Sequence, residues 1–116
     1  MTTQNGVVGS ASFTEKQIVD ASAHPPIIEA VELAASQGTL ARGQFLARDA
    51  NGKCIPYTTE NNDFAGVLTE AVDTTVNTLG LALEHGCYVL ANCLVAAAVP
   101  AAADIAEAKA KGCWAR

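Results

Sequence analysis

The feature that most constrains this chain is a series of short apolar segments separated by turn signals. The clearest case is Thr39–Thr58, where two such segments flank Asn51-Gly52, a dipeptide that favours a tight hairpin because both residues tolerate positive φ. Pro56 in the second segment indicates an edge strand or an early end, because proline has no N–H to donate to a neighbouring strand. This stretch therefore predicts an antiparallel β unit.

Further segments extend the β pattern. Residues 64–73 (FAGVLTEAVD) and 75–84 (TVNTLGLALE) predict strands, the second with leucines at alternate positions. His85-Gly86 predicts a turn, after which residues 87–95 (CYVLANCLV) return as another strand. Short strands at this close spacing are typical of a small barrel or sandwich.

Residues 27–36 (IIEAVELAAS) fit neither a helical nor a strand period cleanly. A helix would place Ile27, Val31 and Ala34 on one face, whereas a strand would alternate the acidic and apolar side chains between two faces. The two prolines before this segment and the Ser-Gln-Gly turn after it are compatible with both.

The C-terminal part changes to a helical pattern. Pro100 is followed by an alanine-rich stretch that predicts a helix over residues 101–111, because proline is well tolerated where a helix begins. Gly112 is a plausible residue just past the end of this helix.

The N-terminal part is small, polar and rich in glycine and serine. One or two helical turns are expected over residues 14–21, and the proline pair at 25–26 would end them. We therefore divide the chain into an N-terminal arm, 1–26, and a β-rich domain, 27–116, that contains the C-terminal helix.

Composition narrows the classes of function. Half of the 116 residues are apolar, but only 5% are aromatic, so the core is built from small side chains and gains from oligomerisation or docking onto a partner. The net charge of −5 and the scattered basic residues argue against nucleic-acid binding. We expect no membrane span and see no secretory signal.

The candidate chemistry is sparse. The four cysteines have no CxxC pair or zinc-ribbon spacing, so reduced, packed thiols are expected. His85 and Cys87 with Cys93 come nearest to a metal constellation but lack a fourth ligand, so no metal and no cofactor is expected. The common catalytic motifs do not occur, and His24 and His85 are expected at the surface. We therefore expect no enzymatic activity.

The order of these features resembles the bacteriophage head decoration proteins, the small capsid-stabilising proteins of tailed phages. The similarity covers residues 27–114 and also favours a strand over 29–35. It is carried by an ordered set of short motifs: Arg42-Gly43, Asn51-Gly52-Lys53, Ala65-Gly66-Val67-Leu68 and His85-Gly86.

This resemblance implies a mainly β fold of the β-clip or barrel-like type, with a short C-terminal helix and an extended N-terminal arm. It implies homotrimers at three-fold positions on the outside of an icosahedral head, bound to the major capsid protein and stabilising the expanded shell. It places the protein on the virion exterior, and in the host cytoplasm before assembly.

The same resemblance implies an arm that pairs with capsid strands through main-chain hydrogen bonds. The candidate capsid contacts in the arm are Val7, Val8, Phe13 and Ile18. The candidate contacts between subunits are Tyr88 and Trp114.

Two other interpretations stay open. A small β-fold module that binds a ligand or glycan from the virion would present clustered aromatic side chains, for which Tyr57, Tyr88 and Trp114 are the candidates. A small enzyme would need two carboxylates in a pocket beside His85.

Overall fold

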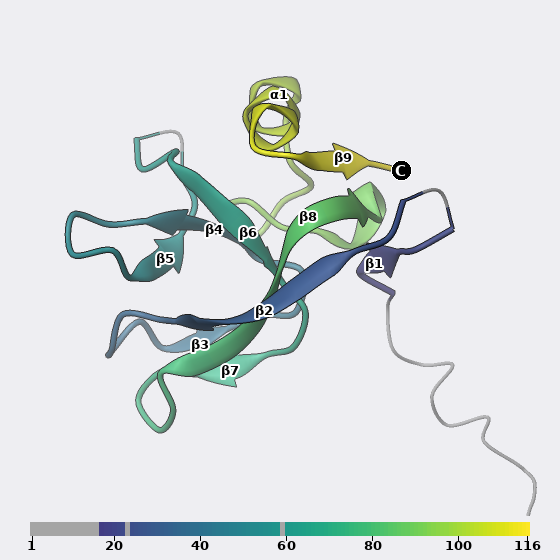
Figure 1. The fold of residues 1–116 in the computed structure, drawn as a ribbon. Helices are drawn as coiled ribbons and strands as arrows, with labels where there is room; N and C mark the ends of the chain where they lie inside the picture. Colours follow the sequence, from purple (N-terminus) through teal and green to yellow (C-terminus); the bar gives the residue numbers. More distant parts are fainter. Residues whose placement is uncertain (1–16, 23, 59) are drawn as a thin grey trace, which may run out of the picture.

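A computed structural model describes residues 17–22, 24–58 and 60–116, which form mainly antiparallel β-sheets and one short C-terminal helix (Figure 1). The elements in chain order are β1 (Val19–Asp20), β2 (Ile27–Glu32), β3 (Thr39–Leu40), β4 (Phe45–Arg48), β5 (Cys54–Pro56), β6 (Phe64–Leu68), β7 (Val72–Asp73), β8 (Leu79–Tyr88), α1 (Ala102–Ala110) and β9 (Cys113–Ala115).

The sheet is organised around β8, the longest strand. Its first half lies between β2 and β6, and its second half pairs with β1 and, in parallel, with β9. Beyond β6 the sheet continues through β4 to β5, and β3 and β7 form a separate two-stranded sheet. Within the described residues this strand order is open, so the barrel expected from the sequence does not close.

The central strands are packed on both faces, because alternate residues of a strand point to opposite sides. One cluster of buried residues contains Ile18, Phe45, Ala47, Tyr57, Phe64, Val67, Leu83, Tyr88, Cys93, Ala108 and Cys113. The other contains Val31, Leu33, Leu40, Leu46, Cys54, Ala65, Leu68 and Ala82. The C-terminal segment therefore covers one face, and the chain from β2 to β3 covers the other.

The hairpin predicted around Asn51-Gly52 is confirmed. β4 and β5 pair antiparallel, and one carboxylate oxygen of Asp49 accepts hydrogen bonds from the backbone N–H groups of Asn51 (2.8 Å) and Lys53 (2.9 Å). Gly52 has a φ of +80°, which explains the need for glycine at this turn. Among the described strands β5 pairs only with β4, as Pro56 indicated.

The strand favoured over residues 29–35 is confirmed up to Glu32, where β2 ends; Leu33 forms an isolated bridge with Cys54, and residues 34–35 lie outside any strand. The predicted helix over 101–111 is observed as α1, which begins at Ala102 and ends at Ala110. One carboxylate oxygen of Asp104 accepts a hydrogen bond from the backbone N–H of Ala101 at 2.9 Å, so the side chain satisfies a donor at the start of the helix.

The turn predicted at His85-Gly86 is wrong, because β8 runs through both residues without interruption. Neighbours on its two sides hold the strand extended: β2 pairs with His85, and β9 pairs with Gly86. Glycine suits this position for two other reasons: its φ is +133°, which side-chain-bearing residues rarely adopt, and a Cβ on Gly86 would lie 3.1 Å from the Cα of Pro26. The chain turns only after Tyr88, in a short 3-10 helix at residues 90–92.

The single strand predicted over 64–73 is two strands, β6 and β7, in different sheets. The helical turns predicted over 14–21 are wrong where the structure describes them, because Val19 and Asp20 pair with Tyr88 and Cys87. Residues 17–22 and 24–26 therefore belong to the folded domain, which begins before the boundary expected at residue 27.

The expectation of reduced, packed thiols is confirmed, since all four cysteines are free and buried. Burial raises the pKa of Cys93 and of Cys113 to about 12 in each case, and it also raises the pKa of Cys54. These thiols stay protonated and behave as core side chains.

Candidate interaction surfaces

An exposed apolar surface lies on the pair formed by β2 and the first half of β8. Ile28 is 43% exposed, Leu79 58% and Leu81 44%. The register sets Ile28 opposite Leu83 and Ala30 opposite Leu81, so these side chains share one face of the sheet. We name Ile28, Ala30, Leu79 and Leu81 the apolar ribbon.

The apolar ribbon is exposed because the C-terminal segment covers only part of this face. Leu83, two residues beyond Leu81 on the same strand, is fully buried in the cluster that includes Ala108 of α1 and Cys113 of β9. The cluster does not include Leu81. The apolar ribbon is therefore the part of this sheet face that α1 and β9 leave exposed.

The edge of β2 beside this ribbon is open. Over its length β2 pairs with β8 alone among the described strands. Glu29 and Glu32 lie on β2, and charges on an edge strand discourage uncontrolled pairing with other chains. A partner that covers the ribbon would also have access to backbone hydrogen-bonding groups.

A shallow groove of about 200 Å³ runs along the start of β8, next to the apolar ribbon. Leu79 and Leu81 form part of its wall, and Glu70 contributes a carboxylate. Its lining residues are Glu70, Ala71, Val72, Asn77, Leu79, Gly80 and Leu81.

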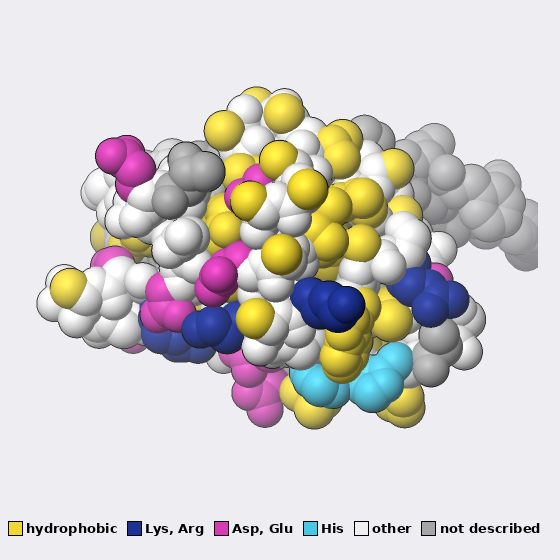
Figure 2. Space-filling view, turned by 90° about the horizontal axis from the view of Figure 1, so that it is seen from above, with side chains coloured by type: hydrophobic (Ala, Val, Ile, Leu, Met, Phe, Trp, Pro, Cys, Tyr) yellow, Lys and Arg dark blue, Asp and Glu magenta, His cyan; other side chains and the backbone are white. Residues whose placement is uncertain are grey.

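A second apolar surface covers α1 and the turn that precedes it, seen as the yellow area across the face in Figure 2. It consists almost entirely of small side chains, and we name it the alanine surface. Its exposed members are Ala96, Ala97, Ala98, Val99, Ala101, Ala102, Ala103, Ala106 and Ala110. The basic residues Lys109, Lys111 and Arg116 come from the end of α1 and from the chain after it.

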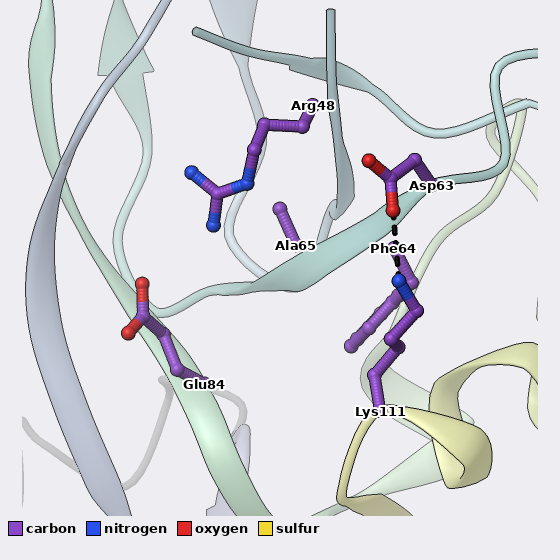
Figure 3. A pocket seen from close by; sticks show the side chains of 6 residues that line it. All are labelled: Arg48, Asp63, Phe64, Ala65, Glu84 and Lys111. Carbon is purple, nitrogen blue, oxygen red and sulfur yellow. Dashed lines mark hydrogen bonds and ion pairs between the residues drawn. The ribbon is translucent and has the colours of Figure 1, made fainter. Parts of the chain in front are cut away.

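A charged hollow of about 270 Å³ lies between β4, β6, β8 and the end of α1 (Figure 3). Lys111 reaches Asp63, with Nζ 2.8 Å from Oδ1, while Arg48 and Glu84 enter from the other side. Phe64 and Ala65 complete the lining.

The surroundings of the two carboxyl groups in this hollow shift their pKa values in opposite directions. The hydrogen bond from Lys111 lowers the pKa of Asp63, whereas burial, followed by a hydrogen bond with Glu29, raises the pKa of Glu84. Arg48 and Lys111 offset Asp63 and Glu84 in formal charge, so the hollow presents no net charge to a ligand. Its interactions connect the end of α1 to β6.

The enzyme interpretation required two carboxylates beside His85. The hollow holds two carboxylates, but His85 does not line it. Instead, its ring contacts His24 at 4.8 Å and Trp114 at 5.2 Å between centroids, and His24 lies 5.1 Å from Trp114. These three rings join the chain before β2 to β8 and β9. Within the described part of the chain, no three His, Cys, Asp or Glu residues are grouped to hold a metal ion.

The residues expected to contact partners differ in whether the structure describes them and in how exposed they are. Val7, Val8 and Phe13 lie outside the described residues. Ile18 is only 2% exposed and Tyr88 is fully buried, so in this fold both are core residues without surface for a capsid or subunit contact. Trp114 is half-buried in the ring cluster and keeps part of its surface accessible.

The sequence reasoning missed the apolar ribbon and the alanine surface. The alternating leucines of 75–84 predicted a strand, and the same pattern is the available signal for the ribbon. The signal for the alanine surface was the run Ala96–Ala98 together with the alanine-rich helix. Sequence alternation and composition do not show which face of a strand or helix is covered by a neighbouring element, so neither exposed surface could be predicted.

No model of a known protein family matches the chain, and no curated protein matches it in sequence. In the part that the structure describes, no helix is long and apolar enough to cross a membrane.

Proposed function

We propose that this protein is a bacteriophage head decoration protein, which binds the outside of an icosahedral head as a trimer at three-fold positions and stabilises the expanded capsid. The observation that carries the proposal is the apolar ribbon beside the open edge of β2. In this proposal the protein has a structural role and no enzymatic activity.

The apolar ribbon supports an assembly role because contiguous exposed apolar side chains on a small domain mark interaction surfaces. Ile28, Leu79 and Leu81 are each more than two-fifths exposed, although the same face is fully packed two residues further along β8. Covering them on a partner would add to the burial that a small domain with few aromatics supplies by itself.

The fold is compatible with the β-clip type that the sequence resemblance implies, since it is mainly β, antiparallel and ends in a short helix. The β-clip assignment itself stays part of the proposal. The backbone N–H of Val89 donates to the carbonyl of Ile18 at 2.8 Å, and β1 pairs with the end of β8, so the chain is firmly attached from this point. An arm carrying Val7, Val8 and Phe13 would extend from a fixed base toward capsid strands.

The remaining features fit the same setting. Buried, protonated thiols suit a protein made in a reducing host cytoplasm before it joins the virion exterior. The glycan-binding alternative needed clustered exposed aromatics, but Tyr57 and Tyr88 are buried and Trp114 packs against two histidines.

Binding to heads tests the proposal directly. Expanded heads assembled from the major capsid protein of the same genome, without decoration, would be mixed with the purified protein and sedimented. We expect saturable co-sedimentation at three copies per three-fold position and heads that resist higher temperature. Protein that stays in the supernatant at all concentrations would overturn the proposal.

A truncation tests the arm separately. The deletion should stop at residue 16, because Ile18 belongs to the core. We expect the truncated protein to keep the unfolding transition of the full chain and to lose head binding. Normal binding by the truncated protein would show that the domain surface, and not the arm, makes the contact.

A further inference from the structure

We infer that copies of this protein associate head to tail, with the apolar ribbon of one copy covered by the alanine surface of the next. This inference rests on the proposed function, in which the protein acts as a trimer, and names the two surfaces that would close that trimer.

The two surfaces differ in shape in a complementary way. The ribbon presents branched side chains, Ile28, Leu79 and Leu81, beside a groove of about 200 Å³. The alanine surface presents small side chains, which let a partner's backbone and branched side chains approach closely. Val99, 54% exposed, is its one large apolar side chain and has a size that suits the groove.

Charge favours the same pairing. Glu70 lines the groove next to Leu79 and Leu81, and Glu32 lies opposite Leu79 in the register. Lys109 and Lys111 lie at the end of α1, next to Ala110 of the alanine surface. Opposite charges around two apolar surfaces promote association between them and discourage each surface from meeting its own copy.

Two of these charges are available for a partner. Within the described residues, the side chains of Glu70 and Lys109 make no hydrogen bond or ion pair. Glu32 and Lys111, in contrast, already form ion pairs with Lys53 and Asp63 at 3.4 Å and 2.8 Å. Glu70 and Lys109 are therefore the pair on which a contact between copies would depend most.

The contact joins two different surfaces of the chain, which limits the type of assembly, and the proposed function supplies the number of copies. The start of β8 and the turn before it lie at the opposite end of the domain from α1 (Figure 1). A contact between two different surfaces of the same chain is heterologous, and heterologous contacts generate rings when the rotation between copies closes. A three-membered ring would use both surfaces of every copy and leave neither exposed.

Charge reversal provides the test. The full-length protein, Glu70→Lys, Lys109→Glu and the double variant would be compared by sedimentation velocity across a concentration series. Glu60→Lys, which makes the same change of charge on an exposed loop, is the matched control. Leu81→Ser tests the apolar part of the contact.

We expect the unmodified protein to form a closed trimer. Each single reversal should weaken association roughly 5- to 30-fold, because it replaces an attraction with a repulsion of similar size. The double variant should recover association to within about 3-fold of the original, since it restores opposite charges across the contact. Glu60→Lys should associate like the original, and Leu81→Ser should weaken association in all backgrounds.

Two results would overturn the inference. One is a protein that stays monomeric at every concentration, and the other is a double variant that associates no better than the single reversals. Head binding is measured separately, so a monomeric protein that still saturates heads would reject this contact and leave the proposed function standing. A protein that forms the predicted ring but does not bind heads would support this contact and reject the proposed function.

Discussion

The two halves of β8 belong to one strand but lie in different surroundings. The second half, from Leu83 to Tyr88, is packed beneath α1 and β9, and Leu83 and Tyr88 are fully buried. The first half exposes Leu79 and Leu81 on the face that Leu83 also occupies. Leu83 therefore contributes to the core, whereas Leu81, two residues before it, remains available for a partner.

This difference separates residues that hold the fold from residues available for assembly. Removing buried side chains from the second half leaves cavities and costs stability, whereas the first half gains burial only when a partner covers it. The predictions below test that division, from the largest expected effect on the free energy of unfolding to the smallest.

The largest effect is expected from shortening the buried leucine. Leu83→Ala should lower the free energy of unfolding by about 2–5 kcal/mol, because it removes buried methyl groups and leaves a cavity. Leu81→Ala is the matched control on the same strand, and at protein concentrations that keep both variants monomeric a change of about 0.5 kcal/mol or less is expected for a partly exposed side chain. Urea denaturation of both variants measures the difference, and equal losses would contradict the division of β8.

A glycine pair extends the comparison to the backbone. A Cβ on Gly43 would lie 2.2 Å from the carbonyl oxygen of Asn92, which follows the packed half of β8. A Cβ on Gly52, in the exposed hairpin turn, would meet nothing within 4 Å. Both residues have positive φ, +88° and +80°.

Gly52→Ala should therefore cost only the roughly 1–2 kcal/mol of the left-handed conformation. Gly43→Ala should cost more than that, because the backbone around Asn92 must also move. Thermal and urea unfolding of both variants would show the order, and a Gly43→Ala variant as stable as Gly52→Ala would contradict the close contact.

A stabilising change is expected at the turn before α1. Ala96 and Ala97 have φ of +52° and +64°, and Val95 and Ala98 exchange backbone hydrogen bonds across them. Two successive residues with positive φ form the kind of hairpin turn that prefers Asn-Gly. Replacing Ala96-Ala97 by Asn-Gly should raise the free energy of unfolding by about 1 kcal/mol. Ala98→Gly serves as the control and should bring no gain.

The smallest effect concerns pH and Glu84, at the junction of the two halves. Its pKa is raised in the folded protein, chiefly by burial, so the folded state holds the proton more tightly than the unfolded state. Glu84 therefore contributes stability below its ordinary pKa of 4.5, and this contribution is lost as the pH rises through the raised value.

Glu84→Gln removes this titration. The variant should gain stability relative to the original protein at about pH 7 and show a smaller difference at about pH 4. Glu60→Gln, on an exposed loop, should show no such change between the two pH values. A Glu84→Gln variant whose relative stability is the same at both pH values would contradict the raised pKa.

Local signals predicted the elements whose conformation is determined by residues close to them in the sequence. The hairpin forms at Asn51-Gly52 because Gly52 takes a positive φ and the side chain of Asp49 accepts hydrogen bonds from the turn, and the alanine-rich stretch after Pro100 makes α1. Four cysteines without paired spacing became core thiols. For the hairpin and the helix the physical cause lies within a few residues of the signal, whereas the burial of the cysteines comes from packing between distant segments.

Tertiary pairing decided the rest. Gly86 carried a turn signal, but β2 and β9 on its two sides keep β8 extended through it, and no local pattern reveals those neighbours. Ile18 and Tyr88 were predicted to contact partners. The pairing of β1 with β8 places both of them in the core. Leu81 and Leu83 follow one sequence pattern. Only the point at which α1 and β9 stop covering the sheet determines that Leu83 is buried and Leu81 is exposed.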